Sequence, residues 1–242
     1  MLMTLAIANY RSIHDLCLPL GPLNVITGAN GSGKSSVYRA LRLLAQAAQG
    51  RIVSSLAAEG GLSSALWAGP EEISRSMRDG TQAVQATVRR QAQRLKLGFA
   101  SDKLGYLIQL GLPAPPAGAF ALDPHIKVEQ IWQGAYLSKS CLRYERKASL
   151  VQARDGKSWI SLSEKLANYD SLLMQVAEPR QTPDLLELRE SIRGWRFYDH
   201  LRSDSAAPAR QPQIGSFTPV LSDDGHDLAA ALQTIIEVGD EA

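Results

Sequence analysis

A glycine-rich loop close to the start of the sequence is the feature that most constrains what the chain can fold into. Residues 27–36 read TGANGSGKSS, and the stretch from Gly28 to Ser35 fits the spacing G-x-x-x-x-G-K-[ST]. Because glycine has no Cβ and reaches positive φ, Gly28 and Gly33 allow the backbone to curl around a bound group. The curled N–H groups form a nest for an anion, and a helix that starts near Lys34 points its positive end at the same place.

The loop therefore predicts a site for the phosphates of a nucleotide, with ATP and Mg²⁺ as the expected cofactors. Lys34 is expected to reach the β- and γ-phosphates, and the hydroxyl of Ser35 is the predicted metal ligand. Ser36 belongs to the same segment but points elsewhere on the helix, so it receives no ligand role of its own. The predicted cofactor-binding segment consists of Gly28, Ala29, Asn30, Gly31, Ser32, Gly33, Lys34, Ser35 and Ser36.

The flanking sequence supplies the context that such a loop requires. Residues 22–27 are short, partly β-branched and bounded by a Gly-Pro pair, which predicts a buried strand. Residues 36–49 carry apolar side chains at helical spacing, and Gly50 is a stop signal. A glycine-rich turn that joins a strand to a helix and binds nothing is the simpler alternative.

Composition and charge exclude several other classes of protein. The 242 residues suit one large domain or two small ones, and a net charge of +2 gives no global electrostatic case for nucleic-acid or membrane binding. The two cysteines and four histidines are scattered, which predicts reduced thiols and no metal site built from these ligands. No apolar run approaches the roughly 18 residues of a membrane span, so the chain is expected in the cytoplasm.

Strands are expected on both sides of the loop. Two short ones precede it, at residues 3–10 and around residues 16–18, and residues 50–80 are expected to form loop and short helix. The next part, residues 81–160, is expected to be antiparallel and β-rich. Alternation predicts strands at residues 83–88, 126–129 and 141–145, and Asp155-Gly156 predicts a hairpin between residues 148–153 and 158–162.

The remainder is expected to be mainly helical. A helix is predicted from Thr182 to Gly194, followed by a strand at residues 195–198 and a polar loop at residues 202–225. Residues 226–238 predict a last amphipathic helix. Its apolar side is expected to carry Leu228, Leu232, Ile235 and Ile236.

These patterns predict an α/β P-loop NTPase fold with an antiparallel β-rich subdomain. Residues 1–80 are expected to be the first part of the P-loop core, and residues 81–180 an antiparallel insert. Residues 181–242 are expected to be a helical end, with no Walker B segment found in them.

A P-loop hydrolase also needs a second acidic element. This is usually an apolar strand that ends in an Asp for Mg²⁺, often followed by a Glu that activates water. The nearest candidate is Ile235-Ile236-Glu237, whose apolar run is too short and fits a helix better. We therefore expect this chain alone to be inactive as an ATPase, with the missing part on another chain or in a longer protein.

The residues around the loop resemble a known family. Asn9-Tyr10-Arg11-Ser12-Ile13, placed ahead of the loop, resembles the opening of the ABC-type ATPases related to RecF, SMC and the OLD nucleases. Residues 195–199, the Arg210-Gln211-Pro212 loop and residues 224–229 resemble the first lobe of the AAA-type ATP-binding proteins of this group, although Asp227 stands where an Asn is expected.

The resemblance implies the first lobe of an ATP-binding head, with Arg11 and Asn30 near the γ-phosphate and Arg11 counted among the cofactor-binding residues. It also implies a homodimer with ATP sandwiched between two heads, and a role in DNA repair or defence. The signature, Walker B and switch histidine of the family lie in the second half of such chains, and none is visible here.

Two other functions remain open from the sequence. The first is a non-hydrolysing, nucleotide-binding regulatory module, favoured by the missing acidic element. The second is a small P-loop kinase, which lacks support because no arginine-rich lid or DxD element is found. The sequence also does not distinguish which glutamine would sense Mg²⁺; the candidates are Gln130, Gln133, Gln175 and Gln211.

Two groups of basic residues raise DNA as a further partner. On a β-rich face they could follow a phosphate backbone, although a solvated strand face is the more common reason for such groups. They consist of Arg89, Arg90, Arg94 and Lys96, and of Lys139, Arg143, Arg146 and Lys147.

Overall fold

The chain has an α/β fold that divides into two compact units, Met1–Arg193 and Gly194–Ala242. The computed structural model describes residues 1–70, 74–82, 92–115, 118–178, 180–199 and 201–239. Each unit is considered by itself. The division into residues 1–80, 81–180 and 181–242 stays a prediction.

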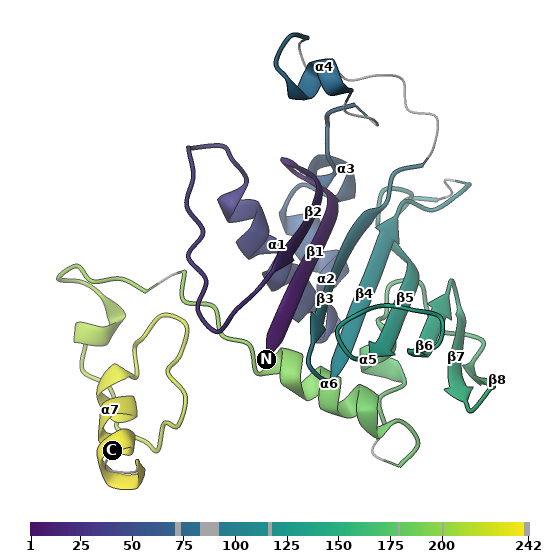
Figure 1. Ribbon diagram of the computed structural model, residues 1–242. Coiled ribbons are helices and arrows are strands. Elements are labelled where there is room, and N and C mark those ends of the chain that lie inside the picture. Colours follow the sequence, from purple (N-terminus) through teal and green to yellow (C-terminus); the bar gives the residue numbers. More distant parts are fainter. Residues whose placement is uncertain (71–73, 83–91, 116–117, 179, 200, 240–242) are drawn as a thin grey trace. The chain divides into compact units, whose positions relative to one another are not determined.

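The first unit is built on one eight-stranded sheet in which every neighbouring pair is antiparallel (Figure 1). The order across the sheet is β2-β1-β3-β4-β5-β6-β7-β8. The strands are β1 Leu2–Tyr10, β2 Ile13–Pro19, β3 Leu95–Ser101, β4 Leu104–Gly111, β5 His125–Gln133, β6 Leu142–Lys147, β7 Leu150–Asp155 and β8 Ser158–Ser163.

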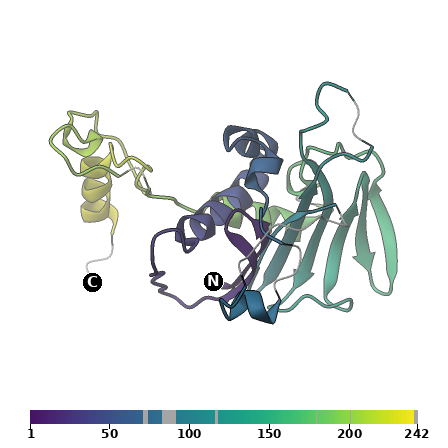
Figure 2. The same ribbon diagram turned by 90° about the horizontal axis from the view of Figure 1, so that it is seen from above.

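The longer helices of this unit lie on one face of the sheet, and no described helix packs on the other face (Figures 1 and 2). The alternation of side chains at the start of β3 fits this arrangement, because Leu95 and Leu97 are fully buried whereas Lys96 between them is exposed. The helices of this unit are α1 Lys34–Ala47, α2 Ile52–Ala58, α3 Leu62–Ala65, α4 Arg75–Arg78, α5 Leu172–Gln175 and α6 Pro183–Arg193.

Most of the elements predicted for the first unit are confirmed. The two strands before the loop, the helix after it, the Asp155-Gly156 hairpin and the helix from residue 183 all form. Strands β3 and β4 were not individually predicted. The strand predicted at residues 83–88 lies outside the described residues.

The strand predicted at residues 22–27 is wrong. The segment has no strand assignment, and Leu23 and Val25 are 85% and 79% exposed. A strand requires a neighbour for its backbone N–H and C=O groups, and no described strand pairs with this segment. The apolar composition predicted burial, but the described part of the chain provides no surface that buries these side chains.

The second unit is small and mostly irregular. It contains a short 3₁₀ turn, η1 Pro208–Arg210, and one longer helix, α7 Leu228–Val238. The last helix is thus confirmed, and Glu237 lies on it rather than at the end of a strand. Its predicted apolar side is exposed, with Ile235 and Ile236 at 64% and 75%. The strand predicted at residues 195–198 does not form.

No described helix is both long enough and apolar enough to span a bilayer. Both cysteines, Cys17 and Cys141, carry free thiols.

A buried ion pair joins the middle of the sheet to the segment that follows it. Glu129 on β5 and Arg146 on β6 face each other, both fully buried, with Arg146 Nη1 donating to Glu129 Oε2 at 3.0 Å. The carboxylate also accepts from the Tyr106 hydroxyl at 2.7 Å, the Ser171 hydroxyl at 2.6 Å and the Leu172 N–H at 3.0 Å.

The guanidinium of Arg146 also has further hydrogen-bond partners, which are backbone carbonyl oxygens. Arg146 Nε and Nη2 each donate at 2.7 Å, to the carbonyls of Ala148 and Ala167, and Nη1 also donates to the carbonyl of Asp170. Burial and the nearby Glu129 carboxylate raise the pKa of Tyr106 well above its usual value. Arg146 is therefore a core residue, and its place in the predicted solvent-facing basic group is wrong.

We expect Glu129→Gln to lower the free energy of unfolding by about 3–5 kcal/mol, because the buried Arg146 charge loses its counter-charge. Urea denaturation followed by circular dichroism measures this. The control is Glu187→Gln, since the Glu187–Lys103 pair is exposed at 2.6 Å and should be worth at most about 1 kcal/mol. Equal effects of the two substitutions would contradict the structural role of the buried pair.

Candidate functional site

The predicted phosphate loop connects the exposed segment before it to the start of α1. Gly33 caps that helix with φ 98°, and Gly28 has φ 153°. A Cβ on Gly28 would lie 2.9 Å from Ser32 Oγ, and one on Gly33 would lie 3.1 Å from Ser12 Oγ. Both positions therefore require glycine, for the conformation and for the space.

Lys34 lies at the first turn of α1 and folds back over the loop. Its Nζ donates to the carbonyl oxygens of Gly28 at 2.6 Å and Ala29 at 2.8 Å. The first turn of α1 contains no acidic residue, and the N-cap provides no side-chain hydrogen bond. The first N–H groups of a helix have no partner within it, so this end carries uncompensated positive charge that suits an anion.

A cavity of about 960 Å³ opens beside the loop. From the predicted cofactor-binding segment, its lining includes Gly28, Ser32, Gly33 and Lys34. The opposite wall comes from the β1–β2 turn and from β2, with Ser12, His14 and Asp15 among the lining residues. The predicted residues Arg11, Ala29, Asn30, Gly31, Ser35 and Ser36 are not part of the lining.

The two serines after Lys34 differ in position. Ser35 is exposed, whereas Ser36 is buried, with its Oγ 3.3 Å from Ser12 Oγ. Ser36 thus joins the helix to the β1–β2 turn. Mg²⁺ usually keeps several waters and binds through substrate phosphates, so one exposed hydroxyl fits its needs. Among the described residues, no three His, Cys, Asp or Glu side chains gather to hold a metal.

Arg11 forms an ion pair with the carboxylate of Glu59, a partner that the sequence did not predict. Its Nε and Nη2 both donate to Glu59 Oε2, at 3.1 and 2.7 Å. The Tyr10 hydroxyl donates to the same carboxylate at 2.9 Å. Burial, together with the Glu59 charge, raises the pKa of Tyr10 to about 12. Glu59 follows α2, and no sequence pattern links it to Arg11, because the pairing arises only when α2 packs beside the turn.

The turn that carries Arg11 has an unusual backbone. Asn9 and Arg11 have φ 58° and 51°, which is uncommon for residues other than glycine. Two hydrogen bonds to the region of α3 hold it, from Arg11 N to the Ala65 carbonyl at 2.7 Å and from Trp67 N to the Asn9 carbonyl at 3.2 Å. Strained backbone of this kind costs about 1–3 kcal/mol per residue and is typical of functional positions.

Comparison with known proteins gives two matches, of which the first includes the loop region. Residues 23–132 match the family described as "AAA domain, putative AbiEii toxin, Type IV TA system". A stretch of 44 residues is 48% identical to an OLD nuclease of Thermus scotoductus. That stretch is 18% of this chain and 8% of the nuclease, so the similarity concerns a small part of the relative. The two matches confirm the resemblance to AAA/ABC-type ATPases over part of the chain.

Proposed function

We propose that the chain binds ATP with Mg²⁺ as the first, P-loop-containing lobe of an ABC-type ATPase head. The observation that carries the proposal is the Lys34 ammonium, held over the curled loop by the carbonyls of Gly28 and Ala29 at 2.6 and 2.8 Å. An ammonium at this place, above a helix start without acidic residues, favours a phosphate ligand. The match to an AAA domain supports ATP as the nucleotide.

In the proposed complex, the loop N–H groups and Lys34 would hold the phosphates, and the Ser35 hydroxyl would hold Mg²⁺. The metal would supply charge neutralisation on the phosphate oxygens. Arg11 and Asn30 are proposed to lie near the γ-phosphate, for which Arg11 would have to exchange its bonds to Glu59. Hydrolysis is proposed to require the second acidic element of a P-loop hydrolase, which was not found in this sequence.

The biological setting is proposed from the similarity of this chain to known proteins. The resemblance to the RecF, SMC and OLD group is the basis for a proposed role in DNA repair or defence, and the proposed location is the cytoplasm. The expected assembly is a homodimer with ATP between two heads.

A non-hydrolysing regulatory module is the second candidate function, favoured by the missing acidic element. Release of inorganic phosphate from ATP by the purified chain would exclude it, and would equally contradict the expectation that the chain alone is inactive; ATP-dependent dimerisation favours the ATPase head over this second candidate.

Lys34→Ala is expected to weaken Mg-ATP binding by about one to two orders of magnitude, because charge-assisted contacts to phosphate are worth about 1.5–3 kcal/mol. The measurement is isothermal titration calorimetry, with the shift of the melting temperature as a second readout. The matched control is Arg39→Ala, an exposed cation on the same helix that lies outside the cavity lining. If both variants bind Mg-ATP like the unaltered protein, the loop is not the nucleotide site.

Arg11→Ala is expected to weaken ATP binding about tenfold and to leave ADP binding nearly unchanged, because only ATP carries the γ-phosphate. Lys34→Ala should weaken both nucleotides, which separates the two roles. Glu59→Gln should strengthen ATP binding relative to ADP, since it removes the charge that competes for Arg11. Equal losses for ATP and ADP in Arg11→Ala would show that Arg11 stabilises the turn and does not contact the γ-phosphate.

A further inference from the structure

The cavity beside the glycine loop has one basic lining residue that the proposed function has not used. Arg78, at the end of α4, lines this cavity together with residues of the loop and of β2 (Figure 1). The cavity volume of about 960 Å³ is at the upper end of the range of about 300–1,000 Å³ that is typical of ligand pockets. A ligand held by the loop therefore has room to extend toward a residue from a separate segment.

The short helix that carries Arg78 is held together by its own hydrogen bonds. Ser74 caps its N-terminus, where the Ser74 hydroxyl oxygen accepts a bond from the Met77 N–H at 3.2 Å. After the helix, the Thr81 hydroxyl donates to the Ser76 carbonyl at 3.1 Å and closes the turn. These bonds define the backbone from which the side chain of Arg78 extends.

The two arginines of α4 differ in their partners and in their places. Arg78 is exposed, and its guanidinium has no acceptor among the described residues. Arg75, on the same helix, lies 3.8 Å from Asp79, measured from Nε to Oδ2, and does not line the cavity. An exposed guanidinium without an acceptor is available to a ligand, because no ion pair has to be broken first.

The charges of the cavity favour an anion beside Arg78. In the described lining, Lys34 and Arg78 are the strongly basic side chains, and Asp15 is the one carboxylate. The ammonium of Lys34 already donates to two carbonyl oxygens of the loop. Arg78 is therefore the cation that is not engaged, and it offsets the Asp15 charge, which would otherwise repel phosphate groups.

We propose that Arg78 is a further phosphate-binding residue, which holds the phosphate chain of the bound nucleotide together with Lys34. The proposal rests on the proposed function, because it places the nucleotide at the glycine loop. A guanidinium suits this role, since its planar fork of N–H donors matches two phosphate oxygens at once. The nucleotide would then bridge the glycine loop and α4, two segments that are far apart in the sequence.

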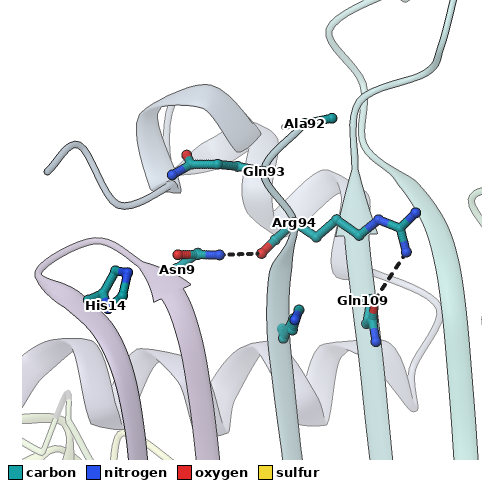
Figure 3. Close-up of a pocket in the computed structure, with 7 residues that line it drawn as sticks. Asn9, His14, Ala92, Gln93, Arg94 and Gln109 are labelled. Atoms are coloured by element: carbon teal, nitrogen blue, oxygen red, sulfur yellow. Dashed lines mark hydrogen bonds between the residues drawn. The ribbon is translucent and has the colours of Figure 1, made fainter. Parts of the chain in front are cut away.

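A second cavity next to the β1–β2 turn provides a control (Figure 3). It has a volume of about 500 Å³, and its lining includes Asn9, Arg94 and Gln109 but no residue of the glycine loop. Arg94 Nη1 donates to Gln109 Oε1 at 3.2 Å (Figure 3). Arg94 belongs to the first basic group predicted from the sequence, of which Arg89 and Arg90 lie outside the described residues. Removal of the Arg94 charge should therefore leave nucleotide binding unchanged.

The test is isothermal titration calorimetry of the full chain with Mg-ATP. Arg78→Gln is expected to weaken binding about tenfold, because a charge-assisted contact to phosphate is lost. Arg78→Lys keeps the charge and is expected to weaken binding only about two- to threefold. The matched controls are Arg75→Gln on the same helix and Arg94→Gln in the second cavity. Both controls should bind Mg-ATP like the unaltered chain.

Three results would overturn the proposal: unchanged binding in Arg78→Gln, an equal loss in Arg75→Gln, or a loss in Arg78→Lys as large as that in Arg78→Gln. The last result would indicate that the planar guanidinium stacks on the base and does not contact phosphate. Melting temperatures without nucleotide identify any loss that arises from unfolding. If Lys34→Ala weakens binding and Arg78→Gln does not, this proposal alone fails. If the unaltered chain does not bind Mg-ATP, the proposed function fails as well.

Discussion

The ion pair between Glu129 and Arg146 is the interaction on which the rest of the first unit depends. Both side chains are fully buried, and a charge placed there without its partner would cost several kcal/mol. Because the two residues lie directly opposite each other, the pair also fixes the register of β5 against β6. Their remaining hydrogen bonds reach Ala167, Asp170, Ser171 and Leu172, and so anchor the segment that leads to α5 and α6.

Two cavities of the first unit border the β1–β2 turn. Ser12 lines the cavity beside the loop and contacts Ser36, whereas Asn9 lines a second cavity together with Arg94 and Gln109. His14 borders both cavities and stacks edge-on against Trp67, with ring centroids 5.7 Å apart. Asn9 and Arg11 both have positive φ in this turn. The strain in this turn is balanced by its backbone bonds to the region of α3.

Much of this architecture could be predicted from local patterns, and the failures share a physical reason. Alternation, the Asp155-Gly156 turn and the glycine loop each encode structure within a few residues, so those elements formed as expected. Residues 22–27 and 195–198 also have strand-like composition, but a strand forms only with a neighbour, which no local pattern provides. Arg146 looked like a surface charge because Glu129, its partner, is distant in the sequence. Glu59 was missed for the same reason, since its meeting with Arg11 depends on the packing of α2.

The structure holds the C-terminal side of the glycine loop more firmly than its N-terminal side. This difference affects how a phosphate would bind there. On its C-terminal side it continues into α1, which is held by Ser36 and by the buried face of the helix. On its N-terminal side the loop follows Leu23 and Val25, which are exposed, so no β-sheet hydrogen bonds hold this side of the loop. Between them, Lys34 binds two neutral carbonyls and so bridges the loop internally. In the proposed complex the ammonium exchanges these acceptors for an ionised phosphate, and charge-assisted bonds are roughly twice as strong as neutral ones. The exchange favours binding, and the ligand would then take over the bridging role that Lys34 fills alone.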